Sequence, residues 1–227
     1  MSKAILIQAR LSSSRFPKKM LQKIGNITLV EYVYRRCLES KIADKAIVIT
    51  STDKTDDELY KLCSEKNIPV CRGSLNNVLE RYLECAIDAQ ATIVCRVCGD
   101  SPFVDVEAID EGFSLFEKNK NLDYISTENT LNGFMSEIIS VNTLKKINSY
   151  LLSAADKEHV TKYIRENSSE FSTFSLNLHL KPIQLEHYTL TVDYESDLNI
   201  INTIITQLND FSFKSSDIIA ILNTLEG

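Results

Sequence analysis

A cationic, hydroxyl-rich segment follows the first apolar run of this 227-residue chain. Residues 8–19 read QARLSSSRFPKK and contain two arginines, two lysines and three consecutive serines. Guanidinium groups donate paired hydrogen bonds and ammonium groups act as point charges, so both suit a polyphosphate. The segment has no glycine and is therefore neither a Walker loop nor a dinucleotide-binding fingerprint. Taken alone, the segment is slightly more typical of a solvated basic loop.

Two isolated carboxylates follow apolar runs further along the chain. Asp100 comes after the run Thr92–Val97, and Asp193 comes after His187–Val192. Each one alone is typical of a turn or a helix cap. A carboxylate at a strand end that faces a phosphate-binding loop can also hold a hard cation such as Mg²⁺. Together with the basic segment, the two carboxylates supply the charges and metal ligands that nucleotidyl transfer needs.

The elements that must position these residues alternate between strand and helix patterns over the first half of the chain. This alternation predicts βαβ units and a mainly parallel sheet with helices on both faces. Ligands bind at the carboxyl ends of such strands, where the basic segment and Asp100 are expected. The predicted strands are Lys3–Ala9, Lys45–Ser51, Ile68–Cys71 and Thr92–Val97, and helices are predicted at Thr28–Ser40, after Thr55, after Ser74 and after Asp105.

The pattern becomes less regular after about residue 122. We expect a single domain over residues 1–227, with a small inserted α+β lobe at about 125–185 for substrate or dimer contacts. The predicted strands here are Leu122–Ser126, Ile138–Val141, Phe171–Leu178 and His187–Val192, and the predicted helices are Asp156–Asn167, Glu195–Leu208 and Ser216–Leu225.

The charge is distributed unevenly along the chain. The net charge is −6, yet residues 1–30 contain six Lys and Arg and no Asp or Glu. The other 197 residues carry 19 basic and 31 acidic side chains, a balance of −12. A mostly negative surface excludes broad binding of nucleic acid, whereas a small anionic ligand near the N-terminus remains compatible with it.

No apolar run reaches the length of a secretory signal or of a transmembrane helix, so we expect a cytoplasmic protein without membrane insertion. In that setting the six cysteines are predicted to be buried thiols. Cys95 and Cys98 have the spacing of a redox motif, but they lie in an apolar run and are interpreted as strand residues.

Five sequence blocks, in order along the chain, resemble the cytidylyltransferase family that includes the spore coat polysaccharide protein SpsF and, more distantly, the CMP-Kdo and CMP-sialate synthetases. The similarity extends over about residues 3–200. The blocks are residues 7–10 (IQAR) with 14–21 (SRFPKKML), 71–74 (CRGS) with 78–82 (VLERY), 96–102 (RVCGDSP), 158–165 (EHVTKYIR) and 190–193 (LTVD).

The resemblance implies a GT-A-like, Rossmann-related α/β fold and a magnesium-dependent nucleotidyltransferase. A nucleoside triphosphate, CTP by resemblance alone, would react with an acidic sugar or a related acceptor for polysaccharide synthesis and release pyrophosphate. A homodimer is also expected from the family. The implied site residues are Arg10, Arg15 and Lys19 for the triphosphate, Ser12, Ser13, Ser51 and Arg72 for the base, Asp100 and Asp193 for Mg²⁺, and Glu137, Glu158, His159, Tyr163 and Arg165 for the acceptor.

The sequence departs from the family pattern at two places that bear on the implied residue roles. Ser12-Ser13 stands where the family usually has Gly-Ser, and residues 133–137 read GFMSE where relatives carry GLDVE.

His159 is a candidate general base because an imidazole titrates near neutral pH. Two other functions stay open: a GT-A glycosyltransferase that uses a nucleotide sugar, and a non-catalytic nucleotide-binding module. GTP in place of CTP also stays open.

Overall fold

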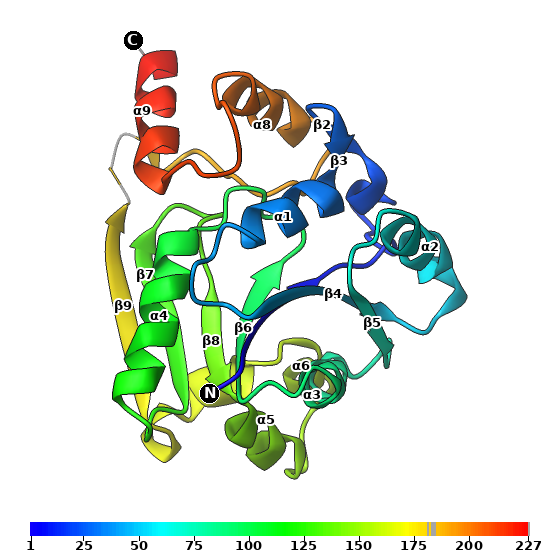
Figure 1. The fold of residues 1–227 in the computed structure, drawn as a ribbon, viewed down its shortest axis with the longest axis vertical. Helices are drawn as coiled ribbons and strands as arrows, with labels where there is room; N and C mark the ends of the chain where they lie inside the picture. The colour runs from blue at the N-terminus through cyan, green and yellow to red at the C-terminus, as the bar shows by residue number, and fades with distance from the viewer. Residues whose placement is uncertain (181, 183–184, 227) are drawn as a thin grey trace.

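A seven-stranded sheet in the order β5-β4-β1-β6-β8-β7-β9 forms the centre of the protein (Figure 1). It is seen in a computed structural model that describes residues 1–180, 182 and 185–226. The strands are β1 (Lys3–Gln8), β4 (Lys45–Ser51), β5 (Val70–Gly73), β6 (Ile93–Cys98), β7 (Tyr124–Thr130), β8 (Glu137–Ser140) and β9 (Thr173–Leu180), and a separate two-stranded ribbon pairs β2 (Lys23–Ile24) with β3 (Ile27–Thr28).

The first half of the sheet is parallel, as predicted. β1 pairs in parallel with β4 and β6, and β4 pairs in parallel with β5. β1 reads as a continuous apolar run because both faces of this central strand are covered by helices. The carboxyl ends of β1, β4 and β6 therefore meet at one edge of the sheet.

Helices cover both faces of the sheet (Figure 1). The helices are α1 (Leu29–Cys37), α2 (Asp57–Glu65), α3 (Val78–Asp88), α4 (Val106–Lys118), α5 (Val141–Asn148), α6 (Ala154–Glu158), α7 (Lys162–Glu166), α8 (Asp197–Ile205) and α9 (Ser215–Glu226). One core packs the sheet against α1, α2, α4, α8 and α9, and a second core packs the other face against α3, α5 and α7. The predicted mainly parallel α/β fold with two covered faces is confirmed.

The second half of the chain extends the same sheet. β8 pairs antiparallel with β6 and with β7, and β9 pairs in parallel with β7. The region expected as an inserted lobe thus contributes three strands to the central sheet, together with α5, α6 and α7. Residues 181, 183 and 184 of that region lie outside the described residues.

Three local predictions were wrong. The segment His187–Val192 is not a strand: it forms one isolated bridge, between Thr189 and Asn132. Its backbone N–H groups instead form hydrogen bonds with loop residues: Leu190 N donates to Asn132 O and Val192 N donates to Asp100 O, each at 2.9 Å. The predicted helix Asp156–Asn167 is divided into α6 and α7 by residues 159–161.

The third wrong prediction is the cap at Thr55. Its backbone N–H and hydroxyl both donate to the side chain of Asp53, which caps a short 3₁₀ turn before α2. By contrast, Asp105 caps α4 as predicted, because its carboxylate accepts the N–H of Ala108 at 2.9 Å.

The prediction of six buried thiols needs a correction, because Cys71 on β5 and Cys85 on α3 form a disulfide. Packing of α3 on β5 brings their Cα atoms to 5.9 Å, a proximity that the linear sequence does not reveal. Cys37, Cys63 and Cys95 are buried free thiols, and Cys98 is half-buried. Burial raises the pKa of Cys37 and of Cys63 to about 12, so both stay protonated.

Gly133, in the connection between β7 and β8, has no room for a side chain. Its φ is +109°, and a Cβ there would lie 2.7 Å from the backbone carbonyl of Leu190. We expect Gly133→Ala to lower the free energy of unfolding by about 3 kcal/mol, through backbone strain and a clash that requires backbone movement.

Urea denaturation provides the test of this prediction, and Gly25→Ala is its control. Gly25 also has a positive φ, but a Cβ there would meet only a side-chain carbon of Ile205 at 3.3 Å. The control should cost about 1–2 kcal/mol. Equal costs at the two positions would show that Leu190 does not confine Gly133.

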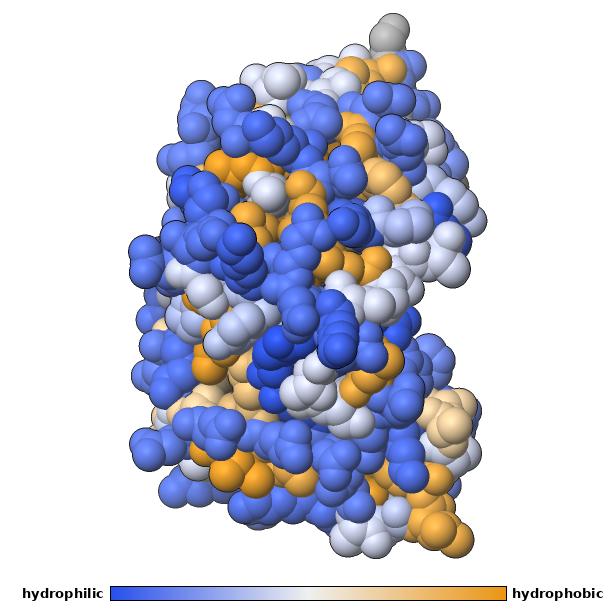
Figure 2. Space-filling model, turned by 90° about the vertical axis from the view of Figure 1, so that its right-hand side faces the viewer, coloured by the Kyte–Doolittle hydropathy of each residue, from blue (hydrophilic) through white to orange (hydrophobic). Residues whose placement is uncertain are grey.

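The surface in Figure 2 is mostly hydrophilic, and its hydrophobic residues are confined to small patches. Among the described residues, no helix is long and apolar enough to cross a membrane.

Candidate active site

Two cavities adjoin at the carboxyl edge of the parallel strands. The smaller has a volume of about 240 Å³ and is lined by the basic loop after β1. The larger has a volume of about 600 Å³ and is lined by residues from β6, β7, β8 and the connection between β7 and β8. Four residues line both cavities: Arg15, Cys98, Asp100 and Asp193. The two cavities therefore meet at the two predicted metal-binding carboxylates.

The basic loop supplies most of the smaller cavity. Arg10, the three serines, Arg15 and Lys19 all line it, so the segment is not simply a solvated loop. Arg10 forms an ion pair with Glu158 at 2.9 Å, and the Arg10 side chain is 41% exposed. A cavity rich in guanidinium, ammonium and hydroxyl donors is suited to an anion with many oxygen atoms.

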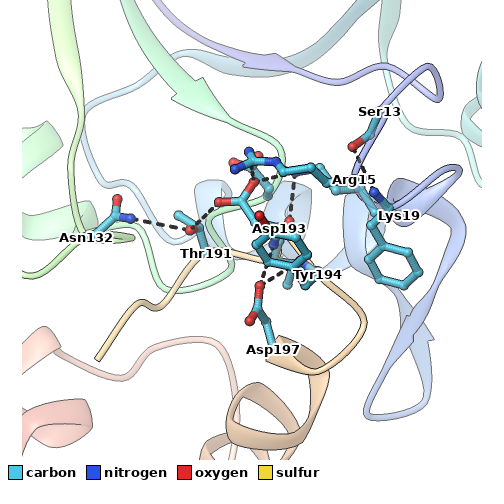
Figure 3. A network of polar contacts seen from close by, with 11 residues as sticks. Ser13, Arg15, Lys19, Asn132, Thr191, Asp193, Tyr194 and Asp197 are labelled. Atoms are coloured by element: carbon cyan, nitrogen blue, oxygen red, sulfur yellow. Dashed lines mark hydrogen bonds and ion pairs between the residues drawn. The ribbon is translucent and has the colours of Figure 1, made fainter. Parts of the chain in front are cut away.

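Lys19 contacts Asp193, one of the residues that line both cavities (Figure 3). The residue is 7% exposed. Its Nζ atom donates to Asp100 Oδ2 at 2.7 Å, to the carbonyl of Val192 at 2.7 Å and to Asp193 Oδ1 at 3.3 Å. These contacts use all three N–H donors of the ammonium group. One buried cation thus holds both carboxylates in a single cluster.

Asp193 is held by its loop and by the start of α8 (Figure 3). Asp197, the first residue of α8, accepts the backbone N–H groups of Asp193 at 2.7 Å and of Tyr194 at 2.8 Å through one carboxylate oxygen. Arg15 contacts the Asp193 carboxylate at 2.6 Å and lies over the ring of Tyr194. The predicted position of Asp193 at a strand end was wrong, yet its carboxylate still reaches the cavity junction.

The two carboxylates fit a divalent cation. Both already converge on one cation, the Lys19 ammonium, and carboxylate oxygens are ligands that Mg²⁺ prefers. The described part of the chain contains no group of three or more His, Cys, Asp and Glu side chains arranged for a metal. The remaining ligands would therefore come from nucleotide phosphates and water, as is usual for Mg²⁺.

Glu137 is the centre of a polar network on the wall of the larger cavity. Its carboxylate contacts Arg96 at 2.6 Å and Arg165 at 2.8 Å, and it accepts hydrogen bonds from the hydroxyls of Tyr124 and Thr161. Burial raises the pKa of Glu137, but these two arginines and two hydroxyls outweigh it, so the pKa lies below its ordinary value of 4.5.

The lowered pKa of Glu137 predicts a pH-dependent contribution to stability. A carboxyl group whose pKa is lower in the folded state stabilises the fold above its unfolded pKa, and this contribution is lost as the pH falls through the folded pKa. We therefore expect Glu137→Gln to have a lower free energy of unfolding than the wild-type protein at pH 7. The difference between the two free energies should narrow once the pH falls below about 4.5. Urea titrations between pH 7 and 3 measure the gap.

Glu128→Gln is the control for that titration, because Glu128 is an exposed carboxylate of the same cavity. Its substitution should change stability at pH 7 much less than that of Glu137. A Glu137→Gln gap that is the same at every pH would contradict the inferred ionic role of the network.

Some predicted site residues do not line either cavity. Ser51 is fully buried, and its backbone N–H and hydroxyl both donate to Asp56. Arg72 donates to the carbonyls of Ser51 and Asp53 and to the carboxylate of Asp57. Ser51 and Arg72 are thus bonded to Asp56 and Asp57, at the start of α2. The predicted residues that line the cavity walls are Arg10, Ser12, Ser13, Arg15, Lys19, Asp100, Asp193, Glu137 and Arg165.

The region after α5 contributes less to the cavity walls than expected. His159 is exposed, and its backbone N–H continues the turn of α6 to Ala155. Tyr163 packs edge-to-face against Tyr150 and Phe171. Of the residues expected from this region, only Arg165 lines the larger cavity, while Glu158 pairs with Arg10.

Several residues that shape the site were not among the predicted ones. Arg96 is the first residue of one of the blocks that resemble the family, so the sequence offered a reason to include it among the site residues. Tyr124 and Asp197 lie in a strand and at a helix start whose positions were predicted only approximately. Asp56 lies among the acidic residues Asp53, Asp57 and Glu58 around the start of α2, and nothing in the sequence separates it from them.

The fold and the cavities define a class of protein. A mainly parallel sheet that presents a basic loop and paired carboxylates at its strand ends is the architecture of an enzyme that uses a nucleotide. The sequence pattern of the cytidylyltransferase family matches residues 4–215, and the chain belongs to this family. It is a nucleotidyltransferase.

Individual relatives agree with the family assignment. The uncharacterized protein MJ1063 of Methanocaldococcus jannaschii is 32% identical over 222 residues, which cover 94% of this chain and 91% of that protein. The spore coat polysaccharide biosynthesis protein SpsF of Bacillus subtilis is 29% identical over 225 residues, covering 96% and 92%. A solved cytidylyltransferase from Leptospira borgpetersenii superposes with a TM-score of 0.92 at 26% identity, covering 100% of this chain and 95% of its own.

Proposed function

We propose that this enzyme transfers a cytidylyl group from CTP to a hydroxyl oxygen of an acidic sugar or a related acceptor and releases pyrophosphate. The observation that carries the proposal is the junction of the two cavities at Lys19, Asp100 and Asp193. The smaller cavity would take the triphosphate and the larger one the acceptor. The choice of CTP rests on family membership.

Charge neutralisation and positioning would provide most of the catalysis. Arg10, Arg15 and Lys19 would hold the triphosphate oxygens, and Ser12 and Ser13 would donate hydrogen bonds to the nucleotide. The acceptor oxygen would attack the α-phosphorus in line with the departing pyrophosphate. His159, which is exposed outside both cavities, is not assigned the role of general base.

Asp100 and Asp193 would hold Mg²⁺. The metal would neutralise phosphate charge and orient the α-phosphate. Lys19, which Asp100, Asp193 and the carbonyl of Val192 hold in place, would add a further positive charge at the junction.

Arg165 is the residue proposed to meet an acidic group on the acceptor. Its side chain is 49% exposed on the cavity wall, and Glu137 fixes one end of its guanidinium at 2.8 Å. Met135, which is 50% exposed, lines the same cavity and would offer an apolar contact. The similarity to SpsF supports an acceptor used in surface polysaccharide synthesis.

Pyrophosphate release tests this function. We expect release when the protein is incubated with CTP, Mg²⁺ and a panel of acidic sugars such as 3-deoxy-manno-octulosonate, and much less with the other nucleoside triphosphates. Conversion of a ready-made nucleotide sugar without pyrophosphate release would instead indicate a glycosyltransferase.

A further inference from the structure

A fully buried carboxylate, that of Asp56, lies behind the basic loop and outside both cavities. One oxygen accepts the backbone N–H of Leu11 at 2.7 Å, and the other accepts the N–H of Ser51 at 3.2 Å and the Ser51 hydroxyl. Burial of a carboxylate is costly unless hydrogen bonds compensate it. The three donors compensate this cost, and the carboxylate in turn satisfies two backbone N–H groups.

The two backbone N–H groups that Asp56 accepts lie where β1 and β4 separate. The two strands pair in parallel, and the last backbone bond between the segments runs from Ala9 N to Ile49 O at 3.0 Å. Beyond this point the amides of Leu11 and Ser51 have no backbone partner across the β1–β4 pair, although Ser51 still pairs in register with Gly73 of β5. Asp56 accepts both, so it joins the strand ends in place of the missing ladder.

Leu11 is the fixed point of the glycine-free basic loop. Its N–H is held by Asp56, its carbonyl accepts the N–H of Lys18 at 3.0 Å, and its side chain is 4% exposed in the core. Its chain neighbours Arg10 and Ser12 both line the smaller cavity. The placement of Leu11 therefore determines where these two side chains meet a ligand.

We propose that Asp56 is the positioning residue of the nucleotide-binding loop: it fixes Leu11 and thereby preorganises Arg10, Ser12 and Ser13 for the nucleotide. The proposal rests on the proposed function for the identity of the ligand. The proposal also gives Ser51, predicted to bind the base, a different role: its hydroxyl donates to Asp56 and would not contact the nucleotide.

Asp56→Asn is the variant that isolates the role. The substitution keeps the size of the side chain but places an NH₂ group opposite an N–H donor, so at least one of the hydrogen bonds that Asp56 accepts is lost. Asp53→Asn is the matched control three residues earlier, because the Asp53 carboxylate accepts only from Thr55 and touches neither Leu11 nor the loop.

Amide hydrogen exchange measured by NMR tests the positioning without any nucleotide. In free wild-type protein we expect the Leu11 amide to exchange at least ~100-fold more slowly than that of Ser13, because it is buried and bonded. Asp56→Asn should speed Leu11 exchange by at least ~10-fold, and Asp53→Asn should leave it near wild type. Equal exchange of Leu11 and Ser13 in wild type overturns the proposal, even if Asp56→Asn does not fold.

Steady-state kinetics tests the consequence for the ligand. Loss of preorganised binding should raise the KM for CTP by about 10-fold in Asp56→Asn while kcat changes less than about threefold, since Lys19 is held by separate contacts. A fall in kcat with an unchanged KM contradicts positioning of the nucleotide. Wild-type protein that turns over no nucleoside triphosphate refutes the proposed function, while the exchange result still decides whether Asp56 orders the loop.

Discussion

Lys19→Ala should reduce turnover of CTP by about 10²–10³-fold, the largest effect that we expect from a single cation in this site. Removal of one preorganised group that stabilises charge in a transition state typically costs about 3–4 kcal/mol. Lys19 fits this description because it is 7% exposed and fixed by three contacts at the cavity junction. The measurement is kcat at saturating CTP and Mg²⁺.

The control for this variant is Lys18→Ala, its neighbour in the chain. Lys18 pairs with Glu58, and both side chains are more than half exposed. This exposed pair should contribute little, so turnover should stay within about twofold of wild type. A loss below tenfold for Lys19→Ala would refute its assigned role.

A second readout of Lys19→Ala does not depend on turnover. Without the ammonium group, Asp100 and Asp193 face one another without a buried compensating charge, which destabilises the protein. Mg²⁺ alone should therefore raise the melting temperature of Lys19→Ala more than that of wild type. An equal or smaller rise would show that the two carboxylates do not share a cation site.

Asp100→Asn should lower turnover by at least ~10³-fold, because it removes one of two proposed metal-binding carboxylates from the junction and metal ions supply several kcal/mol of charge stabilisation. Asparagine is close in size and can still accept a hydrogen bond from Lys19, so the protein should remain folded. The comparison is kcat for the variant and wild type over a range of Mg²⁺ concentrations, with the melting temperature of each.

Glu107→Gln is the control for Asp100→Asn. Glu107 pairs with Lys214 on the surface, and both side chains are at least 60% exposed. Its removal should leave both turnover and the dependence on Mg²⁺ unchanged. If Asp100→Asn retained more than a tenth of wild-type turnover at every Mg²⁺ concentration, Asp100 would not be a ligand of the metal.

The first half of the fold could be predicted from the sequence because local patterns and tertiary environment agree there. Strands such as Lys45–Ser51 are apolar runs buried on both faces of a parallel sheet, and their bounds were predicted to the residue. The segment His187–Val192 has a strand-like pattern too, and Leu190 and Val192 are fully buried. Its backbone bonds are made to Asp100 and Asn132 in distant loops, and a local pattern cannot distinguish that from a strand.

The candidate site likewise has a part that could be predicted from the sequence and a part that could not. The basic loop was recognisable because its residue types are concentrated in one short segment. The Glu137 network was recognisable only in part. The resemblance pointed to Glu137 and Arg165, but only the folded sheet brings Arg96 and Tyr124 to the same carboxylate. The disulfide between Cys71 and Cys85 was missed for the same reason.

The central claim is that an acceptor oxygen attacks the α-phosphorus of CTP where the two cavities meet. Its most direct test follows the label from CTP carrying ³²P at the α or the γ position, incubated with Mg²⁺ and the panel of acidic sugars. We predict that α-label appears in the sugar product and γ-label appears only in pyrophosphate. Transfer of γ-label to the sugar, or failure of α-label to reach any acceptor while pyrophosphate is released, would contradict the claim.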